Sequence, residues 1–238
     1  MEILTDIPVE LTVAEALKHM RMRKKSASFE QTVNEVLEMV RPVAQPKAMY
    51  MPVYVEHKGE NTVSLDGVTF TSRVLRRNLD SVERVFPYVT TCGKEVDEIA
   101  APQGDLLKTY CLDAVKELLM RSTRRYLKDY ISRKYAVPQM SAMAPGSLQD
   151  WPITEQRGLF SLFGDVQKLI GVQLTDSCLM IPVKSTSGIY FPTEVRFESC
   201  QLCPRAVCSG RRAPYDPELA RSYGLNHEES AASVGEAS

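Results

Sequence analysis

The length, composition and charge of the chain exclude several classes of protein. Its 238 residues are 44% hydrophobic, which is enough for a domain with a buried core. The 29 lysines and arginines nearly balance the 30 aspartates and glutamates, so the net charge of −1 gives no general attraction to nucleic acid or anionic lipid. No apolar run approaches the roughly 20 residues that span a bilayer, and the first residues lack a secretory signal. We therefore expect a cytoplasmic protein that binds neither nucleic acid nor membrane.

The first half of the chain predicts helices followed by antiparallel strands. Thr12 and Glu15 form a capping box ahead of an amphipathic helix. Ser28 begins a similar pattern, and Arg41-Pro42 ends the second helix. Hydrophobic periodicity and turn residues then predict strands within 49–70, a helix over 72–79, a strand over 84–91, a turn at 92–94 and a long helix over 105–135.

The second half predicts loops, short helices and strands. The elements expected are a shaped loop over 141–147, helices over 154–163 and 165–170, and strands over 178–183 and 188–191 around a polar turn at 184–187. Strands and helices do not alternate regularly, which is typical of an α+β fold with a twisted antiparallel sheet and flanking helices. We expect one domain over 1–223, with a Cys-rich loop at 198–216, and a small, polar, disordered tail over 224–238.

Several segments resemble one known family. The run from Gly171 to Ser177, followed by Met180, Pro182 and residues 185–191, resembles the S-adenosylmethionine-binding activation domain of cobalamin-dependent methionine synthase. Pro145-Gly146, Trp151-Pro152 and Glu155-Gln156 fit the same family at matching separations. The resemblance extends from about Thr12 to Arg196, and we expect a free-standing version without zinc, folate or corrinoid domains.

The resemblance implies the reactivation of a corrinoid methyl carrier. S-adenosylmethionine and one electron from a flavodoxin or ferredoxin would return cob(II)alamin on a corrinoid-binding protein or methyltransferase subunit to methylcobalamin. The chain would then act as a subunit of a cobalamin-dependent methyltransferase of the methionine synthase type. The resemblance implies no catalytic residue, and it assigns the ligand groove to Pro145, Gly146, Ser147, Ser187, Gly188, Tyr190, Arg196 and Phe197.

The chain departs from the family at two groove positions. The family motif Arg-x-x-x-Gly-Tyr reads here as Ala142 through Ser147, so the arginine and the tyrosine are replaced. Losing a charged hydrogen bond costs about 1.5 to 3 kcal/mol, and Arg196 or Lys184 could supply the missing cation. An acidic residue that helps to hold the ligand in the family corresponds to Lys116 or Glu117.

A cysteine-rich segment lies beyond the resemblance. Cys200, Cys203 and Cys208 could place three thiolates around a structural zinc ion or an iron–sulfur cluster, with Cys92 or Cys178 as the fourth ligand. The alternative is that these three cysteines are reduced thiols that bind no metal. A bound cluster would make the chain a non-enzymatic corrinoid-docking or electron-delivery subunit, and a purely structural partner of a methyltransferase is a third interpretation.

Two further features have competing interpretations. Six basic residues of the long helix form either a solvated face or a contact for an acidic partner: Arg121, Arg124, Arg125, Lys128, Arg133 and Lys134. Trp151 is either packed at the start of a helix or placed beside a corrin ring. Ser177 and Ser187 have no His and acid at a recognisable spacing, which disfavours a hydrolase.

Overall fold

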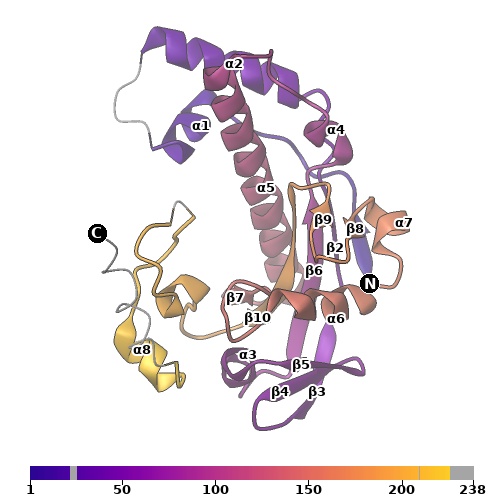
Figure 1. Ribbon diagram of the computed structural model, residues 1–238. Helices are drawn as coiled ribbons and strands as arrows, with labels where there is room; N and C mark the ends of the chain where they lie inside the picture. The colour runs from indigo at the N-terminus through magenta and orange to yellow at the C-terminus, as the bar shows by residue number, and fades with distance from the viewer. Residues whose placement is uncertain (22–25, 209, 226–238) are drawn as a thin grey trace.

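An eight-stranded antiparallel sheet forms the centre of the fold (Figure 1). The computed structural model describes residues 1–21, 26–208 and 210–225. The strands of the main sheet are β1 Glu2–Leu4, β2 Lys47–Tyr50, β3 Val53–Lys58, β4 Thr62–Leu65, β5 Val68–Thr71, β6 Arg84–Thr91, β7 Met140–Met143 and β10 Ser185–Pro192. Strands β8 Gln173–Leu174 and β9 Met180–Ile181 form a separate pair.

The helices lie around this sheet at both ends and on both faces. They are α1 Val13–His19, α2 Ala27–Val40, α3 Arg73–Asn78, α4 Lys94–Asp97, α5 Leu106–Tyr135, α6 Gln156–Ser161, α7 Val166–Ile170 and α8 Pro217–Ser222. Two 3₁₀ helices, η1 Ile153–Glu155 and η2 Ser199–Leu202, precede α6 and α8. The predicted α+β class with an antiparallel sheet is confirmed.

Strand β6 is the central strand of the sheet. It pairs with β2 and β3 along one edge and with β10 along the other, and β10 pairs in turn with β7. Seven of its eight residues are buried, and two of them, Thr90 and Thr91, are polar. The order β6-β10-β7 brings residues 84–91, 140–143 and 185–192 side by side although they are distant in the sequence.

Helix α5 connects two hydrophobic cores. Its first half packs with α1 and α2, where Leu112, Val115 and Leu119 are buried. In its second half, Leu127 and Ile131 pack on the tyrosines of the sheet. Figure 1 shows the helix running from the upper helical layer down across the strands. One helix therefore fixes the helical layer against the sheet.

The opposite face of the sheet is covered by shorter elements. Phe160, Phe163 and Val166 of the α6–α7 region pack on Met49 and Val89. A separate core under β3–β5 includes residues of the C-terminal arm, by which we mean residues 193–208 and 210–225. Figure 1 shows this arm beside the sheet, on the same side as α1. The arm is thus packed against the rest of the described chain.

Three predictions of local structure require correction. The second helix starts at Ala27, because Ser26 rather than Ser28 caps it by accepting a hydrogen bond from the amide of Phe29. Residues 140–143 form β7 instead of a loop, because they pair with β10. Residues 185–187 belong to β10 instead of a turn, because they pair with β6. Of the predicted tail, residues 226–238 lie outside the described residues.

In the described part of the chain, no helix has both the length and the apolar character needed to cross a bilayer.

Glu2 joins the first strand to the end of α5. Its carboxylate accepts hydrogen bonds from Tyr50 at 2.6 Å and from Tyr130 and Lys134 at 2.5 Å each. Burial raises the pKa of Glu2, but the hydrogen bonds from Lys134, Tyr130 and Tyr50 outweigh it and lower the pKa from 4.5 to about 2. A carboxylate that is ionised more easily in the folded state stabilises the fold where it is charged.

The substitution Glu2→Gln should therefore lower the free energy of unfolding at pH 7 by about 1 to 3 kcal/mol. The wild type should lose this contribution as the pH falls from 4.5 towards 2, because the unfolded chain binds the proton first. Urea unfolding at several pH values measures both effects. The exposed Glu60→Gln serves as the control, and equal losses in the two variants would contradict the assignment.

Candidate functional site

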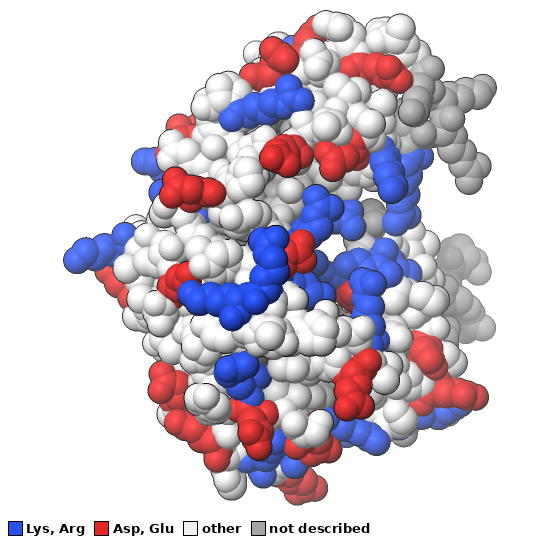
Figure 2. All heavy atoms as spheres, turned by 180° about the vertical axis from the view of Figure 1, so that it is seen from behind, with Lys and Arg blue, Asp and Glu red and all other residues white. Residues whose placement is uncertain are grey.

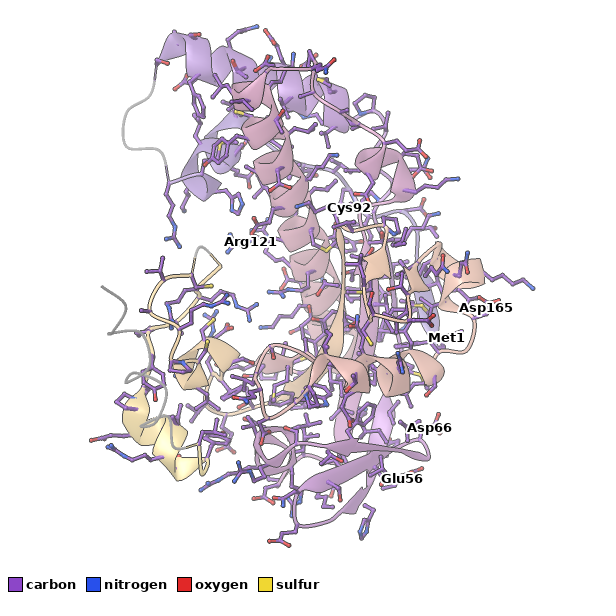
Figure 3. The ribbon with its side chains drawn as sticks, in the orientation of Figure 1. Met1, Glu56, Asp66, Cys92, Arg121 and Asp165 are labelled. Carbon is purple, nitrogen blue, oxygen red and sulfur yellow. The ribbon has the colours of Figure 1, made fainter. Side chains whose placement is uncertain are left out.

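A groove lies between α1, α5, the β7–β10 pair and the C-terminal arm. Two adjoining cavities of about 470 and 580 Å³ make up the groove. Both are lined by His19, Arg21, Arg121, Arg124 and Arg212. Figure 2 shows Lys and Arg side chains gathered around a hollow in this part of the molecule, and Figure 3 shows Arg121 on the side of α5 that faces the arm. This groove is the candidate ligand site.

Strand β10 positions the floor of the groove. Because side chains alternate between the two faces of a strand, Thr186, Gly188 and Tyr190 share the face that α5 covers. Thr186 lines one cavity and Tyr190 lines the other. The ring of Tyr190 stacks on Tyr88 at 4.2 Å, and its hydroxyl donates to the carbonyl of Arg124 at 3.0 Å. Burial raises the pKa of Tyr190, so the phenol stays neutral.

The first cavity, which we name the mixed half, combines apolar, acidic and basic side chains. Met20, Met120 and Tyr110 line it together with the carboxylates of Asp113 and Glu117. A carboxylate oxygen of Glu117 lies 3.7 Å from Nε2 of His19, and Asp113 accepts from Lys184 at 2.7 Å. The mixed half can therefore contact a ligand that has an apolar ring and charges of both signs.

The neighbouring Lys116 lies outside the groove. Its ammonium group donates to the carbonyl of Ile99 at 2.8 Å, and burial lowers its pKa. Of the two positions that the sequence left open for the acidic ligand residue, only Glu117 lines a cavity.

The second cavity, which we name the basic half, has a large excess of positive charge. Eight of its eighteen lining residues are Lys or Arg, and two are Glu. The basic residues are Lys18, Arg21, Arg121, Arg124, Arg125, Lys128, Arg196 and Arg212. The two halves of the groove thus differ in the ligand charge that they favour.

Two of the eight residues assigned by the resemblance line the groove. They are Tyr190, on β10, and Arg196, at the start of the C-terminal arm. Arg196 donates to Glu198 at 2.9 Å, and Glu198 forms a bridge to Ala142 of β7. Ala142, the position where the family has arginine, also lines the basic half. The structure therefore places a cation from the arm close to the position that lacks one.

The other six assigned residues lie elsewhere or beneath the floor. Gly188 sits on the groove face of β10 but is covered by Tyr88 and by the carbonyl of Met143. Ser187 faces the opposite side and accepts a hydrogen bond from Gln156 at 3.1 Å. Phe197 is buried and packs on Tyr223, with ring centroids 5.9 Å apart.

Pro145, Gly146 and Ser147 form the turn after β7. The amide of Gly146 donates to the carbonyl of Trp151 at 2.7 Å, and its φ of +79° suits glycine. A hydroxyl hydrogen bond joins Ser147 to the carbonyl of Ala144 at 2.6 Å. None of these three residues lines either cavity. Trp151 is fully buried against Phe70, which supports packing rather than contact with a corrin.

Sequence reasoning did not identify several residues that line the groove. The basic face of α5 was noticed, but its interpretation as a solvated face or a partner contact missed that α1 and the arm fold over it. No motif marks His19, whose Nδ1 lies 2.8 Å from an Arg121 nitrogen. Arg212 lies beyond the resemblance, so no motif could indicate it. The spacing of the Lys and Arg residues along α5 was the one feature of the sequence that could have indicated the groove.

The three cysteines of the arm do not form a metal site among the described residues. Nowhere in residues 1–21, 26–208 and 210–225 do three His, Cys, Asp or Glu side chains gather as a metal would require. Cys200 lies beside the backbone amide of Arg212 at 3.5 Å. Cys92 is fully buried in the helical core, and burial raises its pKa to about 12, which disfavours the thiolate. A zinc or iron–sulfur site is therefore not shown among the described residues.

Comparisons with known proteins agree with the fold. Residues 121–200 match the family described as the vitamin B12 dependent methionine synthase, activation domain. A crystal structure of the MetH reactivation domain bound to AdoHcy is similar over 95% of this chain and 87% of that one, with a TM-score of 0.58 and 16% identity. A comparison with curated proteins finds no match.

The fold is that of a methionine synthase activation domain. The resemblance expected from the sequence is confirmed, by sequence over 121–200 and by fold over most of the chain. The matched residues include the second half of α5, β7 and β10, which form much of the groove.

The close packing of β10 against β7 in the floor of the groove can be tested by adding a side chain at Gly188. A Cβ at position 188 would lie 2.6 Å from the carbonyl oxygen of Met143 and 3.0 Å from the hydroxyl of Tyr88. Gly188→Ala should therefore destabilise the protein by about 1 to 3 kcal/mol, as overpacking does. Gly210→Ala is the control, because its Cβ would meet only the sulfur of Cys208 at 3.9 Å. Urea unfolding that shows no difference between the two variants would contradict the packing described.

Proposed function

We propose that the chain reactivates a corrinoid methyl carrier on a partner protein by reductive methylation with S-adenosylmethionine. The observation that carries this proposal is that the family match at 121–200 coincides with the helix and strands that form the groove. The similar MetH reactivation domain was crystallised with AdoHcy, the product that remains when S-adenosylmethionine gives up its methyl group. We place such a ligand in the groove.

The mixed half of the groove fits the chemistry of S-adenosylmethionine. The ligand carries a sulfonium and an ammonium, both cationic, together with a carboxylate and an adenine ring. Asp113 and Glu117 provide negative charge for the cationic groups, while Met20, Met120 and Tyr110 provide an apolar surface for the ring. The cavity of about 470 Å³ lies within the range of small-molecule sites.

The carboxylate of the ligand requires a cation that position 142 does not supply. Arg121 and Arg124 line both halves of the groove and can replace the missing guanidinium, whereas Arg212, which also lines both, is bound to Glu198 at 3.2 Å. Arg196, which the sequence suggested, lines only the basic half, and Lys184 is bound to Asp113 at 2.7 Å. We therefore assign the role to Arg121 and Arg124.

The protein contributes binding and orientation in this function. When bound, S-adenosylmethionine supplies an electrophilic methyl group for the cobalt of the partner's corrinoid, after a flavodoxin or ferredoxin provides one electron. The groove opens at the surface, so the methyl group can be presented to a corrinoid held by another protein. Tyr190 and Tyr88 stack beneath the groove, and we expect this packing to hold β10 in place under the ligand.

Titration calorimetry with S-adenosylmethionine tests this function. We expect saturable binding to one site per chain, weakened about tenfold by Glu117→Gln, because that variant removes a charge partner of the cationic groups. Asp129→Asn on the same helix is the matched control, since Asp129 is exposed and lines neither half of the groove.

Two results would overturn the methyl-donor role. One is the absence of S-adenosylmethionine binding both with and without a corrinoid protein. The other is an equal loss of binding in Asp129→Asn and Glu117→Gln.

A non-enzymatic corrinoid-docking or electron-delivery subunit remains the alternative function. It requires a cluster held by Cys200, Cys203 and Cys208, which lie on one segment but lack a fourth ligand nearby among the described residues. Anaerobic purification followed by iron, sulfide and zinc analysis distinguishes the two. Stoichiometric iron and sulfide without S-adenosylmethionine binding would favour the alternative.

A further inference from the structure

The basic half of the groove carries more positive charge than S-adenosylmethionine can balance. That ligand brings two positive groups and one negative group, whereas this cavity is lined by eight basic residues and two acidic ones. We propose that the basic half is a second binding site, for the phosphate groups of an organic polyphosphate of nucleotide size. This inference goes beyond the proposed function because it concerns a different ligand, although the basic half adjoins the mixed half and shares five lining residues with it.

Both acidic residues of the basic half are already engaged. Glu15 accepts hydrogen bonds from the backbone amide and the hydroxyl of Thr12 in the capping box of α1. Glu198 binds two arginines, with 2.9 Å to Arg196 and 3.2 Å to Arg212. Glu198 is therefore shared by two arginines, and Glu15 forms no ion pair with a basic side chain of the cavity among the described residues.

Four of the remaining basic residues lack an acidic partner. Within the described residues, no carboxylate lies within 4.0 Å of the charged groups of Lys18, Arg124, Arg125 or Lys128. Three of them lie within five residues of one another on α5, so their charges lie close together. A concave surface with unpaired charges of one sign attracts a ligand of the opposite sign.

The environment of Lys128 indicates that these charges interact. Burial lowers its pKa first, and the positive charges of Arg196 and Arg124 lower it further against the opposing effect of Glu198 and Asp129. A phosphate group placed among these side chains would relieve their repulsion. Arginine and lysine are the side chains that proteins use to bind phosphate.

The shape of the basic half favours a small ligand over an acidic protein. Its volume of about 580 Å³ lies within the range of small-molecule sites. Leu11, Leu118 and Met140 provide apolar surface beside the charges, which suits a base or sugar. The phosphodiester of a corrinoid carries a single negative charge. A polyphosphate carries several negative charges, which match the several unpaired cations better.

Calorimetric titration with ATP, AMP and inorganic tripolyphosphate tests the proposal. We expect ATP and tripolyphosphate to bind at least about tenfold more tightly than AMP, with an affinity that falls as salt increases. The double variant Arg125→Gln, Lys128→Gln should lose about tenfold or more in ATP affinity. Arg133→Gln is the matched control, because Arg133 is an exposed residue of α5 that lines neither cavity.

The outcomes separate this site from the S-adenosylmethionine site. ATP binding that survives both Glu117→Gln and saturating S-adenosylmethionine supports two sites, whereas displacement of ATP by S-adenosylmethionine overturns the second one. The proposal is overturned if ATP and tripolyphosphate fail to bind at millimolar concentration, or if Arg133→Gln weakens ATP as much as the double variant. Binding of only cobalamin, or of only an acidic protein such as flavodoxin, would overturn it as well.

Discussion

The packing of α5 against two cores is the constraint on which the rest of the structure depends. Its first half holds α1 and α2 through Leu112, Val115 and Leu119, and its second half holds the sheet through Leu127 and Ile131. The exposed side between these contacts faces the C-terminal arm and carries the arginines of the groove. Because one rigid helix sets the position of both layers, the groove is defined by the fold and not by a single loop.

Electrostatics divides the groove into two halves with different preferences. The mixed half places Asp113 and Glu117 opposite arginines, which suits a ligand with charges of both signs. The basic half has its two glutamates occupied by neighbours and leaves several cations unpaired. The arm contributes Arg196 and Arg212 to this division, although it lies largely beyond the family match at 121–200.

Local signals in the sequence were sufficient for most elements but insufficient for the groove. The strand over 84–91 and the helix after Asp105 follow from periodicity and capping, which are local properties. The strand at 140–143 was missed because its stability comes from pairing with β10, about 45 residues away in sequence. Arg212 could not be identified from the sequence, because its position depends on how the arm folds to bring Arg212 beside Glu198.

A crystal structure of the protein with S-adenosylhomocysteine would test the central claim most directly. The account predicts the ligand in the mixed half, with its adenine beside Met20 and Met120 and its amino group near Glu117. A ligand bound instead at the turn of Pro145, Gly146 and Ser147, away from both cavities, would contradict it.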